Sequence, residues 1–243
     1  MASDVAHYEG LTHWSPIRAA RVESILDRLA LGAGHHALDL ACGRAELLIR
    51  LVERFGVAAT GVDRSAAAIA IAEAELARRA PAATVSLVVG DATRFAPSSS
   101  EHDVVSWLGG PYLDGGFAST LRRLASWTRP GGHVIVGHGF WASEPPSAYL
   151  DATGIPRDEL ASHDANVALV EAAGLTVVDA SISDREEWDH FEGRILANWE
   201  RHLGAHPEDA ELRATVEKKR AWDAAQRRWG RAAMGFGLYL SRR

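Results

Sequence analysis

Cysteine is almost absent from the 243-residue sequence, since Cys42 is the single one. A lone cysteine excludes an intramolecular disulfide and a cysteine-cluster metal site. No apolar run approaches the roughly 18 residues that a membrane helix needs. The first ten residues, MASDVAHYEG, also lack the apolar core of a signal peptide. We therefore expect a cytoplasmic protein that makes no contact with a membrane, built as one large domain or as a domain with an insertion.

Positive charge is also in short supply, because 26 Lys and Arg stand against 32 Asp and Glu, for a net charge of −6. Phosphate contacts need clustered Lys and Arg, so a nucleic-acid partner is disfavoured, although a local basic face stays open. The basic tract EKKRAWDAAQRRWGR (217–231) favours a helix with a solvated charged face. No set of Cys, His and carboxylate residues shows the spacing of metal ligands, so no metal site is expected.

Apolar runs of strand length alternate with amphipathic stretches of helix length. The strands are predicted at 37–41, 57–63, 84–91, 103–108 and 133–139, and the helices at 14–31, 47–55, 65–79 and 117–127. Ser15 and Ser65 are suited to cap the first and third of these helices. This alternation is typical of an α/β fold, a doubly wound and mostly parallel sheet with helices on both faces.

The last hundred residues follow another pattern. A helix at 164–173 and a strand at 175–183 precede a long amphipathic tract, which breaks at Pro207 before the β-like end MGFGLYLSRR. We expect a seven-stranded sheet with an antiparallel terminal strand, and a helical cap inserted before that strand at 184–232. With an N-terminal helical lid at 1–31, this predicts one Rossmann-like domain over 1–243. The cap should roof a ligand pocket, because such a tract must bury its apolar stripe.

The stretch ALDLACGRAE (37–46) indicates where a ligand binds. An apolar run reaches Asp39 and is followed by the small residues Ala41, Cys42 and Gly43, which allow backbone N–H groups to approach a ligand at the carboxyl end of a strand. The next two strands end in Asp63 and in Asp91, which Ala92 follows.

These acidic strand ends favour a particular kind of ligand. Glu46, at the start of the helix after the loop, would repel the diphosphate of a dinucleotide. A rim of carboxylates suits a ligand that carries positive charge and a ribose but no phosphate. S-adenosylmethionine is such a ligand.

Five short motifs now resemble those of the class I S-adenosylmethionine-dependent methyltransferases, in the family's order and spacing over residues 35–139. ALDLACGRAE is similar to the first motif, D-x-G-x-G-x-G, and the others are TGVDRS, VVGDATRF, DVVSWLGG and RPGGHVIVG. Ala41 and Ala45 replace the first and third glycines, which costs little where φ is negative. The tract DREEWDHFEGRILANWERHLGAHPEDAE also resembles a branch of bacterial small-molecule methyltransferases related to methyltransferase type 11.

The resemblance implies roles for particular residues in binding S-adenosylmethionine. Asp39 would orient the loop and reach the amino group, and Asp63 would bridge the ribose hydroxyls. The remaining contacts would come from the loop, from residues around the adenine and from residues beside the methionine part, namely Ala41, Cys42, Gly43, Glu46, Arg64, Asp91, Ala92, Trp107 and Leu108. For Cys42, a small buried filler is favoured over a redox role.

The sequence indicates less clearly which residues bind the methyl acceptor. His138 after the fifth strand, Tyr112 after the fourth and His13 on the N-terminal segment are candidate catalytic groups that position or deprotonate an acceptor, or else ordinary hydrogen-bonded residues. The sequence GGPY (109–112) stands where adenine- and glutamine-directed relatives carry Asn-Pro-Pro-Tyr or Asp-Pro-Pro-Tyr. We therefore predict in-line methyl transfer to an O, N or C atom of a small molecule. An RNA methyltransferase, a non-catalytic S-adenosylmethionine-binding module and a homodimeric state stay open.

Overall fold

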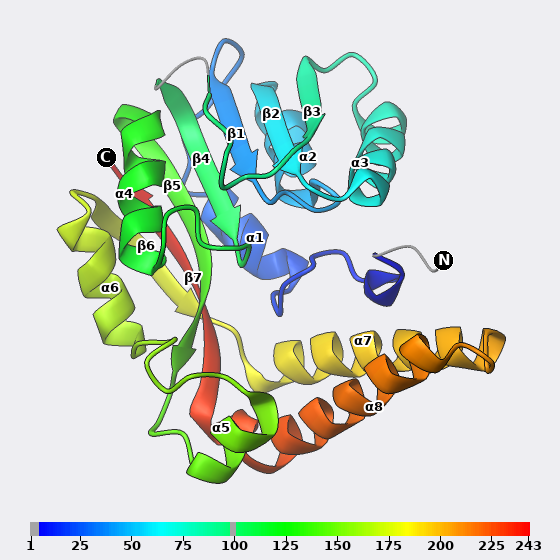
Figure 1. The fold of residues 1–243 in the computed structure, drawn as a ribbon. Coiled ribbons are helices and arrows are strands. Elements are labelled where there is room, and N and C mark those ends of the chain that lie inside the picture. The colour runs from blue at the N-terminus through cyan, green and yellow to red at the C-terminus, as the bar shows by residue number, and fades with distance from the viewer. Residues whose placement is uncertain (1–4, 98–100) are drawn as a thin grey trace.

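The computed structural model describes residues 5–97 and 101–243. Its strands form one sheet in the order β3-β2-β1-β4-β5-β7-β6 (Figure 1), with β7 antiparallel to both of its neighbours and the other pairs parallel. The strands are β1 (His36–Leu40), β2 (Ala58–Asp63), β3 (Val85–Val89), β4 (His102–Leu108), β5 (Thr128–Trp141), β6 (Thr176–Ile182) and β7 (Met234–Arg242). This confirms the predicted fold class, a mostly parallel sheet with an antiparallel terminal strand.

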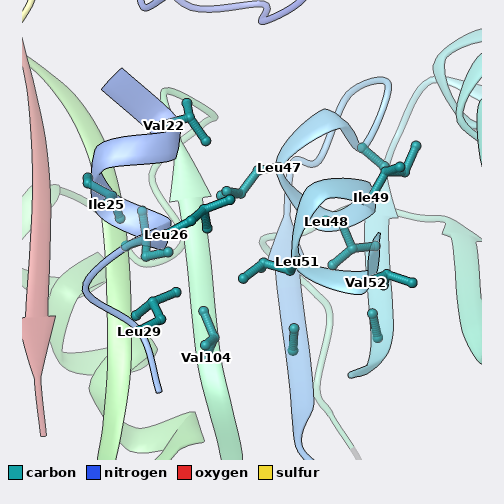
Figure 2. Packing of buried hydrophobic residues seen from close by; sticks show 14 of the residues in the cluster. Val22, Ile25, Leu26, Leu29, Leu47, Leu48, Ile49, Leu51, Val52 and Val104 are labelled. Carbon is teal, nitrogen blue, oxygen red and sulfur yellow. The ribbon is translucent and has the colours of Figure 1, made fainter. Parts of the chain in front are cut away.

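Helices cover both faces of this sheet. They are α1 (Ala19–Leu26), α2 (Glu46–Phe55), α3 (Ala66–Arg79), α4 (Phe117–Trp127), α5 (Ser147–Thr153) and α6 (His163–Ala172). Helices α1 to α3 pack on one face, where the leucines of α2 meet Val22, Ile25 and Leu26 of α1 (Figure 2). Helices α4 and α6 pack on the other face. Adjacent strand residues supply opposite cores, as Val104 and Val105 do, because side chains alternate along a strand.

Two helix starts were predicted from serine residues, and one of them is confirmed. The hydroxyl of Ser65 accepts a hydrogen bond from the N–H of Ala68 at 3.1 Å and caps α3. The prediction for Ser15 is wrong: its hydroxyl donates to the carbonyl oxygen of Leu108 at 3.2 Å, and α1 begins only at Ala19. Within residues 5–18, the structure describes a single 3₁₀ turn, η1 (Ala6–Tyr8), so the helix predicted at 14–31 is shorter than expected and corresponds to α1.

The chain from α7 to α9 forms the helical part predicted between the last two strands. Helices α7 (Arg185–Ala205) and α8 (Ala210–Ala225) run side by side, followed by a π-helical turn, η2 (Gln226–Gly230), and by α9 (Arg231–Ala233). Asp184 and Glu187 form a reciprocal capping box at the start of α7. In Figure 1 this hairpin lies beyond the carboxyl ends of β1 and β4, with the N-terminal segment between hairpin and sheet. Within the described residues, no helix has the length and apolarity to cross a membrane.

Candidate active site

A cavity of about 600 Å³ opens where β1, β2, β3 and β4 end. The strand order reverses between β1 and β4, which is where doubly wound sheets bind ligands. Most of the predicted site residues line this cavity, namely His13, Asp39, Ala41, Cys42, Gly43, Glu46, Asp63, Arg64, Asp91, Ala92 and Leu108. Its volume lies within the usual range of small-molecule sites, about 300–1,000 Å³. We call it the cofactor cavity.

The loop between β1 and α2 keeps a glycine-like backbone although two of its family glycines are alanines. Ala41 has a φ of 54° and Ala45 a φ of 57°, both in the left-handed region, and Gly43 between them has a φ of 55°. An L-residue in this region costs about 1–2 kcal/mol. The two alanines would cost little conformational free energy only at a negative φ, and neither has one. The loop retains its shape and carries strain instead.

Aromatic side chains of the N-terminal segment lie directly on this loop. A Cβ atom at Gly43 would come within 2.8 Å of Cε3 of Trp14, so only glycine fits beneath the indole. Tyr8 in turn stacks on Trp14, with ring centroids 4.6 Å apart and an angle of 12° between the planes. Both aromatic residues line the cofactor cavity, whose outer wall is thus made by the N-terminal segment. Sequence reasoning missed Tyr8, because no motif marks it.

Asp63, at the end of β2, ties the loop to the neighbouring strand. One carboxylate oxygen accepts a hydrogen bond from the N–H of Gly43 at 2.8 Å, and the other accepts from the N–H of Ser65 at 2.9 Å. Each oxygen of an ionised carboxylate can accept more than one hydrogen bond. Asp63 therefore keeps acceptor capacity for a ligand hydroxyl inside the cavity.

Asp39 is buried beneath the loop, 3 % exposed. Burial raises the pKa of its carboxyl to about 7; the hydrogen bond from the hydroxyl of Ser106 at 2.6 Å opposes this rise, and the charge of Asp63 adds to it. Burial, followed by the charges of Asp39 and Asp63, also raises the pKa of the Cys42 thiol well above its usual value. A protonated thiol is a poor nucleophile, in keeping with the interpretation of Cys42 as a filler.

Glu46 lies at the start of α2, as expected, but its charge is already compensated. Arg50 donates from Nε to one carboxylate oxygen at 2.7 Å, and Arg79 donates from Nη1 to the other at 2.7 Å. Two guanidinium groups thus offset the charge of Glu46, and the repulsion of a diphosphate expected from the sequence is not supported. This pairing could not be predicted from the sequence, because Arg79 lies at the carboxyl end of another helix, α3.

The third acidic strand end sits at the open rim. Asp91 is exposed, and one of its oxygens accepts from both the N–H and the hydroxyl of Thr93, at 2.9 and 2.7 Å, which lowers the pKa of the carboxyl. The buried Ala92 and the exposed Arg64 complete this part of the wall. Asp91 and Ala92 follow β3, which is two strands away from β1, the strand that carries Asp39.

Trp107 does not line the cofactor cavity, contrary to its predicted place beside the methionine part of the ligand. Its indole is 1 % exposed, stacks near Tyr112 and donates from Nε1 to the carbonyl oxygen of Pro111 at 3.2 Å. Successive residues of a strand point to opposite faces of the sheet. Leu108 therefore faces the cavity, and Trp107 packs in the core beneath α4.

The three candidate catalytic side chains do not converge. Tyr112 and His138 lie close to one another, with Oη and Nε2 3.5 Å apart, but neither lines the cofactor cavity. His138 lies within β5 rather than after it and stacks on Phe117 with centroids 4.0 Å apart. Burial lowers its pKa to about 4. This pair belongs to the packing beneath α4, and its proposed catalytic role is not supported by its position.

His13 is the candidate that reaches the cavity. It is 6 % exposed, and burial lowers its pKa to about 4, with the nearby charges of Arg50, Arg44 and Arg79 acting in the same direction. Its ring is therefore neutral near pH 7. Among the residues that the structure describes, no group of three or more His, Cys, Asp or Glu side chains is arranged to hold a metal ion.

Comparison with known proteins identifies the domain that builds this cavity. Residues 37–132, which contain the loop and all four strand ends, match the family model of a methyltransferase domain. The Escherichia coli protein YjhP is 28% identical over 193 residues, 77% of each chain, and its crystal structure covers 98% of this chain and 97% of its own with a TM-score of 0.88.

Two further solved structures share the whole architecture. A S-adenosylmethionine-dependent methyltransferase from Thiobacillus denitrificans, in complex with S-adenosyl-L-homocysteine, is 25% identical with a TM-score of 0.86. A corresponding complex from Geobacter sulfurreducens is 24% identical with a TM-score of 0.87. In both cases the match covers 98% of this chain and 96% of the other. Residues 37–132 therefore match a methyltransferase domain, and the chain as a whole shares its fold with solved S-adenosylmethionine-dependent methyltransferases.

Proposed function

We propose that the protein methylates a small molecule with S-adenosylmethionine held in the cofactor cavity. The observation that carries this proposal is the carboxylate of Asp63, which is fixed by the N–H groups of Gly43 and Ser65 and still has acceptor capacity toward the cavity. Asp39 lies beneath the same loop, where an ammonium group would favour its ionised form. The similar protein from Thiobacillus denitrificans was crystallised with S-adenosyl-L-homocysteine, which supports the same ligand here.

The reaction needs positioning more than acid–base chemistry. When bound, S-adenosylmethionine supplies a methyl group on a sulfonium, and an acceptor lone pair would form the new bond as the methyl–sulfur bond breaks to leave a neutral thioether. A protic acceptor would then release its proton to water. Asp63 would hold the ribose hydroxyls, and Asp39 would face the amino group. Tyr8 and Trp14 would exclude water from the loop side. Holding both reactants in line is itself a large part of the rate enhancement.

The cation distribution favours a small acceptor over RNA. Within the basic tract at 217–231, Arg220 pairs with Glu200, Arg227 with Asp223 and Arg231 with Asp189. None of residues 217–231 lines the cofactor cavity as the structure describes it. A phosphate backbone needs clustered cations that are free to bind it. RNA remains the second candidate, and the experiment below separates the two.

The test follows the methyl group into fractions of a cell extract. We would incubate the protein with methyl-labelled S-adenosylmethionine and an extract separated into small molecules below about 1 kDa, RNA and protein. Label should enter the small-molecule fraction with the wild type and not with Asp63→Ala. Label in RNA would support the second candidate, and label in no fraction would contradict both.

A further inference from the structure

A second cavity, of about 440 Å³, lies between the N-terminal segment and α7. Its walls come from residues 10–13, 15 and 17–19, and from Glu186, Glu187, His190 and Phe191 of α7. Figure 1 shows the segment running between the sheet and this helix. Helix α7 thus contributes to this second cavity, whereas no residue of 184–232 lines the cofactor cavity in the part of the chain that the structure describes.

The two cavities share a wall made of Thr12, His13 and Ser15. The hydroxyl of Ser15 is engaged with the carbonyl oxygen of Leu108. Nε2 of His13, in contrast, is buried and has no hydrogen-bond partner among the described residues. An unpaired buried polar atom costs about 1–3 kcal/mol, so a bound group that donates a hydrogen bond to it is favoured. At neutral pH the uncharged ring can accept a hydrogen bond at this nitrogen.

The charged groups of the second cavity are already paired. The Glu187 carboxylate accepts from the N–H of Arg18 and from the guanidinium of Arg21 at 2.6–3.0 Å. Arg18 also pairs with Asp184 and with Glu186. An anionic ligand would face two glutamates, and no cation of this wall is left for it. Apart from Thr12, His13, Ser15 and His190, the remaining side chains of the wall are apolar, namely Leu11, Ile17, Ala19 and Phe191.

We propose that this second cavity is the acceptor site and takes a small uncharged molecule, mostly apolar, whose O–H or N–H donates to Nε2 of His13. This rests on the proposed function, because only the cofactor cavity beyond the shared wall supplies a methyl donor. The hydrogen bond orients the acceptor's oxygen or nitrogen toward that wall. His13 thus selects acceptors that carry a protic group.

Matched probes test this assignment without knowledge of the natural acceptor. Phenol and aniline carry one O–H or N–H function on an apolar ring, whereas anisole and N,N-dimethylaniline have the same ring without a donor. Their binding to protein saturated with S-adenosyl-L-homocysteine would be measured by saturation-transfer NMR. We expect phenol or aniline to bind at least fivefold more tightly than its methylated counterpart, and this preference to vanish in His13→Phe.

Two variants of α7 locate the binding. His190→Trp fills the second cavity and should abolish binding of phenol and aniline. Ala197→Trp places the same indole at an exposed position of α7 that lines neither cavity and should leave it unchanged. Binding that survives His190→Trp, equal binding of the methylated probes, or no binding by any probe would overturn the proposal. S-adenosyl-L-homocysteine is titrated first, because its binding tests the proposed function. If it binds and the probes do not behave as expected, only the acceptor-site proposal fails.

Discussion

The inner and outer walls of the cofactor cavity are held in different ways. The inner wall consists of strand-end loops, in which backbone N–H groups and nearby carboxylates fix one another, as Asp63 and Gly43 do. The outer wall is the N-terminal segment, residues 5–18, which depends on side chains almost two hundred positions away. Asn198 donates to the carbonyl oxygens of His7 and Glu9 at 2.9 and 2.8 Å. Contacts between neighbouring strand ends thus hold the inner wall in place, whereas the position of the outer wall depends on contacts with α7.

The first prediction targets this attachment. The Glu187 side chain is fully buried and holds Arg21 and the N–H of Arg18. Removing it in Glu187→Ala leaves these donors unpaired, so we expect a loss of about 3 kcal/mol in the free energy of unfolding. Glu186→Ala removes an 87% exposed carboxylate from the same helix turn. This substitution should change the free energy of unfolding by less than about 0.5 kcal/mol. Urea unfolding measures both, and equal losses would show that the attachment does not depend on Glu187.

The second prediction concerns pH and the inner wall. The Asp39 pKa of about 7 lies above its ordinary value of 3.8. The unfolded chain therefore loses this proton at lower pH than the folded one, and the contribution of Asp39 to stability falls between about pH 4 and pH 7. A ligand ammonium that requires the ionised carboxyl should bind about tenfold more tightly at pH 8 than at pH 6. Calorimetric titration of S-adenosyl-L-homocysteine should show this slope in the wild type and not in Asp39→Asn. A wild-type affinity that is flat with pH would contradict the assignment.

The third and smallest effect concerns the two loop alanines. Ala41→Gly relieves a left-handed alanine at the cost of a more flexible unfolded chain, so we expect a gain of about 0.5–1 kcal/mol. Ala45→Gly relieves the same strain but removes a fully buried methyl group worth about 0.8 kcal/mol, so it should be nearly neutral. Thermal unfolding compares the two. Destabilisation by Ala41→Gly would argue against strain in this loop.

The same division between local and distant contacts explains what the sequence could predict. The cofactor motifs could be recognised because each acidic residue lies at or just beyond the carboxyl end of a strand, and α4 spans the predicted residues 117–127. Asp63 and Gly43 meet because parallel strands end at one edge of the sheet. The sequence could also have predicted that only one of Trp107 and Leu108 faces the cavity, since neighbouring side chains on a strand point to opposite faces of the sheet.

Other features depend on contacts that no local pattern encodes. The compensation of Glu46 comes from Arg79 on another helix. Residues 14–18 do not form the predicted start of a helix because Ser15 is bonded to Leu108, and His7 packs on Trp199 with their rings stacked 4.9 Å apart. Similarly, nothing in the sequence around the two histidines indicated that His13 lines the cofactor cavity while His138 does not.

Calorimetric titration of S-adenosyl-L-homocysteine into the wild type and Asp63→Ala tests the central claim most directly. The account predicts one site of micromolar affinity in the wild type. In Asp63→Ala the affinity should fall at least tenfold, since a hydrogen bond to a charged group is worth about 1.5–3 kcal/mol. Asp91→Asn, which changes the exposed rim, should weaken binding less. No binding by the wild type at millimolar ligand, or equal binding by Asp63→Ala, would contradict the account.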